Sequence, residues 1–118
     1  MVGVQHFLIL SAVLFGIGLY GALSRRNAIT VLMCVEIMFN AVNVAFVALS
    51  RYVVPAVVAA NPGSTGAEVA QTVLTGQVFA VFVITVAAAE VALGLAIVIA
   101  IYRVRETVDL TDVSLMRR

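Results

Sequence analysis

The sequence predicts an all-α integral membrane protein with three transmembrane helices. Of its 118 residues, 64% are hydrophobic and only 11% are charged, and the mean hydropathy is +1.17. A soluble domain has about a quarter of its residues charged. Three apolar runs are each long enough to cross a bilayer core, which takes about 20 helical residues. Because backbone groups in lipid must be bonded within their own segment, we expect these runs to be helices.

The three apolar runs lie between the few charged residues of the chain. The first covers residues 2–23 and holds no charge. The second covers 27–50 and contains only Glu36, and the third covers 77–102 and contains only Glu90. A very short connection joins the first two runs, which predicts an antiparallel helix hairpin.

Two further segments lie outside these spans. Residues 51–76 contain Pro55 and an Asn-Pro-Gly-Ser sequence, which break helices and favour turns, so we expect an outer loop there. Residues 103–118 form a polar tail of mixed charge, which we expect to be ordered only against a partner. Taken together, residues 1–118 are predicted to form a single membrane domain.

The arginines predict the orientation of the chain in the membrane. The first connection carries Arg25 and Arg26 and the tail carries four more, whereas the N-terminus has none and the second connection has only Arg51. Positively charged residues collect on the cytoplasmic side of membrane proteins. Three spans place both arginine-rich segments on the same side. We therefore expect the N-terminus outside and the C-terminus in the cytoplasm, stroma or matrix.

The two acidic residues within the spans are the main functional candidates. Glu36 lies ten residues past Arg26 and Glu90 thirteen residues before Arg103, which corresponds to about 15 and about 20 Å of helix. An acidic residue near mid-bilayer costs about 2.5 to 3.5 kcal/mol on insertion scales. A carboxyl group removed from water has a raised pKa and can exchange protons near neutral pH. The sequence therefore predicts a proton relay through these two glutamates.

Polar side chains accompany the first of these acids. Asn40 and Asn43 stand four and seven residues after Glu36, on the same face of the predicted helix, where they can support the carboxyl group or bridging waters. If the second and third helices pack together, Glu36 and Glu90 come within one or two water molecules of each other. The alternative is a structural role, in which both acids form hydrogen bonds that hold a helix bundle together.

Composition excludes several other functions. A net charge of +1 gives no dense cationic surface for nucleic acid. Cys34 is the only cysteine and His6 the only histidine, so the chain offers no disulfide and no ligand set for a metal or a redox cofactor. Residues 16–21 match the glycine pattern of dinucleotide sites, but they lie inside a predicted span. There Ser11, Gly18 and Gly21 are expected to form a stripe of small residues for helix packing.

Five segments of the chain together match the pattern of a known family. They are Gln5-His6, Arg25-Arg26-Asn27-Ala28, the stretch from Cys34 to Asn43, Gly76-Gln77-Val78-Phe79 and the stretch from Ala87 to Ala96. In these residues the chain resembles subunit K of the proton-pumping NAD(P)H-quinone oxidoreductases, the complex I family. The resemblance covers all but about residues 53–75. The region from Ala100 to Asp109 is particularly similar to the cyanobacterial and plastid branch. The stretch from Cys34 to Val47 is equally similar to bacterial respiratory versions of the subunit.

The resemblance implies a membrane-arm subunit that relays protons and has no catalytic centre of its own. Glu36 and Glu90 match glutamates of the hydrophilic axis that carries protons along the arm, coupled to quinone reduction, and Arg25 and Arg26 match a cytoplasmic loop that supports activity. The implied partners are the lipid bilayer, the antiporter-like subunits and subunits A and J, with flavin and iron–sulfur clusters held by other subunits. The implied location is the inner (plasma) membrane of a prokaryote, or the thylakoid membrane for the cyanobacterial or plastid type, with NADH, NADPH or ferredoxin as electron donor.

One departure and two rival interpretations accompany this resemblance. Family members usually join the second and third helices by a short loop, so this chain is expected to carry an insertion of roughly twenty residues within 51–76. The nearest rival is the related small C-type subunit of multisubunit cation/proton antiporters. The other is a purely structural spacer that seals a joint in the membrane arm.

Overall fold

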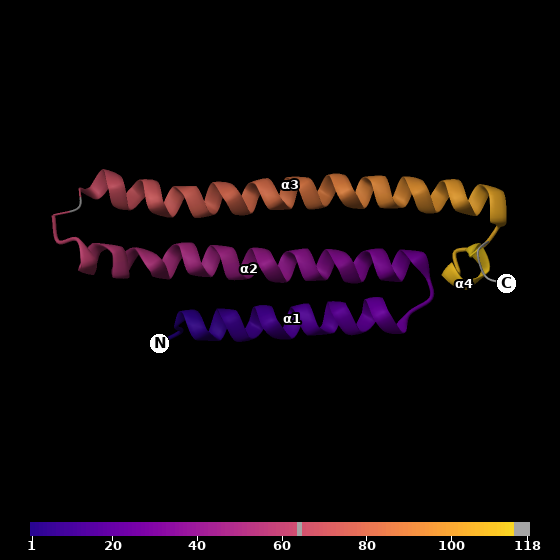
Figure 1. The fold of residues 1–118 in the computed structure, drawn as a ribbon, viewed down its shortest axis with the longest axis horizontal. Coiled ribbons are helices and arrows are strands. Elements are labelled where there is room, and N and C mark those ends of the chain that lie inside the picture. The colour runs from indigo at the N-terminus through magenta and orange to yellow at the C-terminus, as the bar shows by residue number, and fades with distance from the viewer. Residues whose placement is uncertain (64, 115–118) are drawn as a thin grey trace.

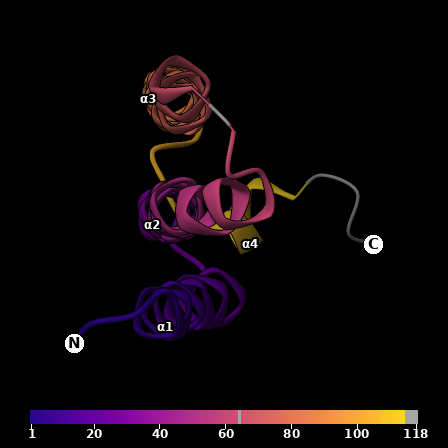
Figure 2. The ribbon, with the colours of Figure 1, turned by 90° about the vertical axis from the view of Figure 1, so that its left-hand side faces the viewer.

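The fold is a single layer of long antiparallel helices. The structure is a computed structural model that describes residues 1–63 and 65–114, and within this part it contains α1 (Val4–Ser24), α2 (Ala28–Ala60), α3 (Gly66–Arg105) and the short α4 (Leu110–Val113). Figure 1 shows the three long helices side by side, and the end-on view of Figure 2 shows α2 between α1 and α3. All three are long and apolar enough to cross a membrane. The predicted all-α class with three membrane helices is confirmed.

The helices α2 and α3 extend well beyond α1 at one end. With 21 residues, α1 is about 31 Å long and matches a hydrocarbon core of about 30 Å. With 33 and 40 residues, α2 and α3 reach about 50 and about 60 Å. Residues 51–76, where the sequence predicted a loop, are therefore helical on both sides of a short turn between Ala60 and Gly66. Pro55 removes only a single backbone donor from a stretch otherwise made of Arg, Tyr, Val and Ala, so the helix continues through it.

A capping box starts α3 much earlier than predicted. Thr65 is the N-cap residue, and its backbone N–H donates to the Glu68 carboxylate at 3.0 Å. The Thr-x-x-Glu spacing is a known signal for the first turn of a helix. Glu68 therefore has a local structural role at the tip of the α2–α3 hairpin.

Small residues allow α1 and α2 to approach closely. The buried Ser11 hydroxyl donates to the carbonyl of Ala41 at 2.6 Å. Gly18 is also buried, and a Cβ atom added there would lie 2.6 Å from Met38 Cγ and 2.8 Å from the Cys34 carbonyl oxygen. Gly21 likewise faces the Cys34 side chain. The predicted packing stripe of small residues on α1 is confirmed.

The polar tail docks onto the first connection of its own chain. Glu106, whose φ is 54°, is the C-cap of α3. Beyond it, the Ala28 N–H donates to the Val108 carbonyl at 2.9 Å and the Leu110 N–H donates to the Arg26 carbonyl at 2.8 Å. We call this pairing of residues 26–28 with residues 108–110 the clasp. The expectation that the tail is ordered only against a partner is thus wrong for this segment. The last arginines of the tail, Arg117 and Arg118, lie outside the described residues.

Asp109 stabilises the clasp as the N-cap of α4. The side-chain hydroxyl and the backbone N–H of Thr111 donate to its carboxylate, and these bonds hold the pKa of Asp109 below its usual value, with a smaller contribution from the positive charge of Arg26. Because the folded pKa is lowered, ionised Asp109 stabilises the clasp above the pKa of the unfolded chain. This stabilisation is lost as the pH falls through the folded pKa.

We expect Gly18→Ala to destabilise the contact between α1 and α2 by about 1 to 3 kcal/mol, because the added methyl group meets a backbone carbonyl that cannot rotate away. In native membranes, the temperature at which the protein becomes susceptible to protease should fall by several degrees. Gly16→Ala is the matched control, since a Cβ atom there meets nothing within 4 Å. Equal thermal stability of the two variants contradicts the packing described for α1.

We expect Asp109→Asn to loosen the clasp at pH 7, because the amide lacks the charge that strengthens both hydrogen bonds from Thr111. Hydrogen–deuterium exchange of the peptides that contain Ala28 and Leu110 should accelerate by about twofold, because asparagine is as good an N-cap as aspartate and only the negative charge is lost. Asp112→Asn serves as control, because the contact of Asp112 with the Thr107 hydroxyl is long, at 3.5 Å.

Candidate functional site

The packing of α2 against α3 places the two membrane glutamates at the same depth. Leu32 of α2 lies opposite Gly94 of α3, where an added Cβ atom would be 2.7 Å from Leu32 Cδ1. Ser50 and Gly76 repeat this pairing further along both helices. The helices are antiparallel, and Glu36 lies four residues after Leu32 while Glu90 lies four residues before Gly94. The two carboxylates therefore stand at one level, about 12 Å from the start of α2.

At this level the two carboxylates occupy opposite sides of the contact line between α2 and α3, which we call the seam. Each helical residue turns by about 100°. Glu90 therefore shares a face with Phe79, eleven residues earlier, whose ring packs against Phe46 at 5.2 Å between ring centroids. Around the axis of α3, Glu90 is turned by about 120° from Ile84, and Ile84 lies on the other side of the seam. Glu36 lies on the Ile84 side, in line with Asn43.

Neither carboxylate is buried by its own chain. Glu36 and Glu90 are both exposed, and within residues 1–63 and 65–114 neither has a hydrogen-bond partner. The predicted supporting residues, Asn40 and Asn43, do share the face of Glu36, but they make no hydrogen bond to it. The structure thus brings the two acids to one depth and leaves each on a separate face of the layer.

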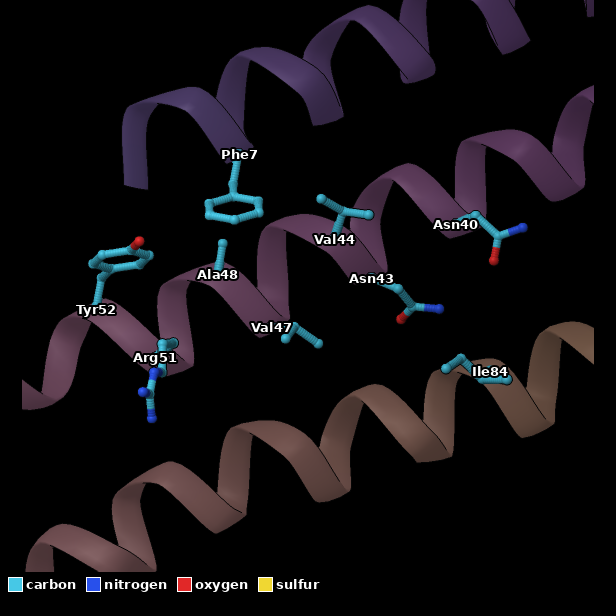
Figure 3. Close-up of a pocket in the computed structure, with 9 residues that line it drawn as sticks. All are labelled: Phe7, Asn40, Asn43, Val44, Val47, Ala48, Arg51, Tyr52 and Ile84. Atoms are coloured by element: carbon cyan, nitrogen blue, oxygen red, sulfur yellow. The ribbon is translucent and has the colours of Figure 1, made fainter. Parts of the chain in front are cut away.

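A groove lies on the Glu36 side of the seam and extends toward the turn between α2 and α3. It has a volume of about 580 Å³, and its lining includes Asn40, Asn43, Val47, Arg51 and Ile84. Figure 3 shows both asparagine side chains projecting from α2 on the side where Ile84 of α3 lies. We call this cavity the Asn43 groove.

Asn43 is the most unusual polar residue of the groove. Its side chain is 7% exposed, and its Oδ1 atom has no hydrogen-bond partner in the described part of the chain. Sequence reasoning identified Asn40 and Asn43 but used Arg51 only to predict the orientation of the chain. Arg51 lies fifteen residues after Glu36, a spacing that places it on the same face of α2. This spacing could have identified Arg51 from the sequence.

The remaining predicted residues lie at the two ends of the layer. Arg25 and Arg26 are exposed in the connection held by the clasp, far from both glutamates along the helix axis. At the opposite end, His6 accepts a hydrogen bond from the Gly3 N–H at 3.2 Å and so caps α1. Among the described residues, no group of three or more His, Cys, Asp or Glu side chains is placed to hold a metal ion.

Comparison with known proteins identifies the family. Residues 6–118 match the family described as NADH-ubiquinone/plastoquinone oxidoreductase chain 4L. The chain belongs to this family. The matched range includes both glutamates and the residues that form the groove and the clasp.

Individual relatives of the chain 4L family cover the chain from end to end. NADH-quinone oxidoreductase subunit K 2 of Geotalea uraniireducens is 48% identical over 117 residues, which is 99% of both chains. Subunit K 1 of Geobacter sulfurreducens and the NAD(P)H-quinone oxidoreductase subunit 4L of a Synechococcus strain are each 49% identical over the same share. Family and relatives support a multi-pass membrane subunit of an NADH- or NAD(P)H-quinone oxidoreductase.

The same coverage bears on the segment between the second and third helices. Because these relatives align over 99% of their own length, they have a segment of comparable length there. The expected insertion relative to the usual family member stays a prediction.

The register of α2 and α3 can be tested by a disulfide. In a Cys34→Ser background, we expect Leu32→Cys combined with Gly94→Cys to oxidise readily, because a Cβ atom at position 94 would lie 3.6 Å from Leu32 Cγ. Peptide mapping by mass spectrometry detects the bond. The control pair, Leu32→Cys with Leu95→Cys, differs by about 100° around α3 and should stay reduced. Preferential bonding of the control pair contradicts the common depth of the two glutamates.

Proposed function

We propose that this chain carries protons between neighbouring subunits in the membrane part of the quinone oxidoreductase and holds no redox group itself. One observation carries the proposal: Glu36 and Glu90 lie at one depth within the membrane helices, on opposite sides of the seam and without partners in the described chain. A pair arranged in this way can accept a proton from one neighbour and deliver a proton to the other.

The energetics of the membrane support coverage of both faces by other subunits. A carboxylate that faces lipid near mid-bilayer costs about 2.5 to 3.5 kcal/mol on insertion scales and more on an isolated helix. A single layer of three helices has no interior in which to bury these groups. Each glutamate therefore lies at an interface, where polar groups of a neighbouring subunit and ordered water compensate its charge.

Protonation changes at these interfaces perform the transfer. A carboxylate takes up a proton from a neighbour or a water molecule and becomes neutral, and it regains its negative charge when the proton leaves. Asn40 and Asn43 stand on the Glu36 face and provide amide donors and acceptors for the water that connects it. Quinone reduction elsewhere in the complex drives the transfer through conformational and electrostatic changes.

Orientation and partners follow from charge and from the family. The arginine-rich end, with Arg25 and Arg26, faces the cytoplasm or stroma, and the N-terminus faces outside. The neighbours are other membrane-arm subunits, among them antiporter-like subunits and subunits A and J. Quinone, flavin and iron–sulfur clusters belong to other subunits. The membrane is the plasma membrane of a prokaryote, or the thylakoid membrane for a cyanobacterial or plastid complex.

Two rival functions make different predictions. A small C-type subunit of a cation/proton antiporter would be encoded beside other antiporter subunits, without redox subunits. A purely structural spacer would need neither carboxylate for transport. The match to the chain 4L family over residues 6–118 favours the redox complex.

We expect Glu36→Gln and Glu90→Gln, each in the assembled complex, to lower both quinone reduction and proton pumping by about tenfold or more, because the amide cannot exchange the proton. Proton pumping into sealed vesicles and quinone reduction measure the two effects. Glu68→Gln is the matched control, since glutamine also completes a capping box and position 68 lies at the hairpin tip.

Native gel electrophoresis establishes that each variant complex is assembled. Assembled Glu36→Gln and Glu90→Gln complexes that pump at the level of Glu68→Gln would contradict the relay and favour the structural spacer. Glu36→Asp should lose less activity than Glu36→Gln, because it retains an exchangeable proton on a shorter side chain.

A further inference from the structure

The Asn43 groove has the length of one leaflet of the membrane. It is lined by Arg51 at one end and by Asn40 at the other, and Figure 3 shows these two residues at opposite ends of the labelled stretch of α2. The eleven residues between these positions correspond to about 17 Å of helix. Half of a bilayer core is about 15 Å thick. A lipid chain that enters at Arg51 therefore reaches the depth of Asn40.

The Arg51 end of the groove lies level with the end of α1. The hydroxyl of Tyr52, the residue after Arg51, donates to the Val2 carbonyl at 2.7 Å, and its ring centroid is 6.2 Å from that of Phe7. Because α1 is just long enough to cross the hydrocarbon core, its N-terminal end marks the membrane surface. The groove thus opens at the surface opposite the arginine-rich connection.

The walls of the groove between its two ends are apolar. They consist of side chains from all three long helices: Phe7, Val44, Val47, Ala48 and Ile84. Asn43 also lines the groove, but it is only 7% exposed, so its amide adds little polar surface to the wall. The volume of about 580 Å³ lies within the range of about 300 to 1,000 Å³ that is usual for ligand pockets. An apolar occupant therefore suits the interior.

Arg51 gives the mouth of the groove a positive charge. Its side chain is exposed, and it is the only charged residue between Glu36 and Glu68 in the sequence. A guanidinium binds a phosphate through two parallel hydrogen bonds that are strengthened by charge. Phospholipid phosphates lie at the level of the membrane surface, where Arg51 is placed. The mouth and the walls are thus complementary to the two parts of a phospholipid.

We propose that the groove binds one phospholipid of the leaflet opposite the arginine-rich connection. Its phosphate contacts the guanidinium of Arg51, and one acyl chain lies along the apolar walls as far as Asn40. The bound lipid fills the hollow between this layer and the subunit that packs against it. Glu36 lies one helical turn beyond Asn40 and stays outside the lipid site. The inference goes beyond the proposed function, since it concerns lipid binding and not proton transfer.

Photolabelling of the intact complex tests this site. The purified complex is washed free of loosely bound lipid in maltoside micelles. It then receives either a phosphatidylglycerol with a diazirine in its acyl chain or, as the matched probe, a diacylglycerol with the same chains and no phosphate. Tandem mass spectrometry assigns the adducts to residues. Val47 and Ile84 line the groove, whereas Leu49 lies on the other side of the seam.

We expect phosphatidylglycerol to label Val47 and Ile84 about fivefold more than the diacylglycerol does, the factor by which one cation at a membrane surface favours an anionic headgroup. Labelling of Leu49 should be equal for the two probes, because no cation lines the groove on that side.

Variants of the assembled complex test the role of Arg51. Arg51→Gln should lower phosphatidylglycerol labelling of the groove to the level of the diacylglycerol, whereas Arg51→Lys should retain most of it, because lysine keeps the positive charge. Arg103→Gln is the matched control, since it removes one arginine at the opposite end of the layer and should leave labelling at Val47 and Ile84 unchanged.

Two results overturn the lipid site. Equal labelling of Val47 and Ile84 by the two probes in the wild-type complex shows that the groove does not recognise phosphate. Absence of labelling there by either probe shows that a neighbouring subunit fills the groove. The comparison of the two probes needs no variant, so it decides the question even if Arg51→Gln prevents assembly. Neither result bears on the relay, which is tested separately by proton pumping.

Discussion

Close helix approach at glycine sets the spacing and register of all three long helices. Helices in lipid gain little from the hydrophobic effect between them, so van der Waals contact through small residues sets their spacing and register. At Gly18, α1 packs directly against the backbone of α2 near Cys34. At Gly94 and Gly76, α3 packs equally closely against the opposite side of α2. The register that follows brings Glu36 and Glu90 to one depth.

The flat layer that results explains why the function belongs to an assembly. In the described part of the chain no large side chain is fully buried, and only small residues and Asn43 lie between the helices with little exposure. Such a layer has two broad apolar faces and no core that could shield an ionisable group. Each glutamate acquires its environment from whatever packs against its face, so the chain presents one carboxylate on each side of the layer.

The two ends of the layer are built by different means. At the arginine-rich end, backbone hydrogen bonds of the clasp tie the tail to the connection between α1 and α2, so a polar segment is ordered by its own chain. At the other end, α2 and α3 continue as a helical hairpin beyond α1, closed by a turn and the capping box of Thr65 and Glu68. The first arrangement holds the connection that carries Arg25 and Arg26 in place, and the second extends α2 and α3 beyond the N-terminal end of α1.

Composition and local spacing are enough to predict the fold class, the three membrane helices, the small-residue stripe on α1 and the two acids within the spans. These follow from composition and local spacing, because the bilayer restricts a long apolar segment to a helix. Residues 51–76 are the exception, because Pro55 favours a loop there, although the Thr-x-x-Glu spacing from Thr65 is typical of a helix start. The common depth of Glu36 and Glu90, their separation by the seam, the clasp and the Asn43 groove are visible only in the folded chain. These depend on how α2 is rotated and shifted against its neighbours, and contacts between residues far apart in the chain set that register.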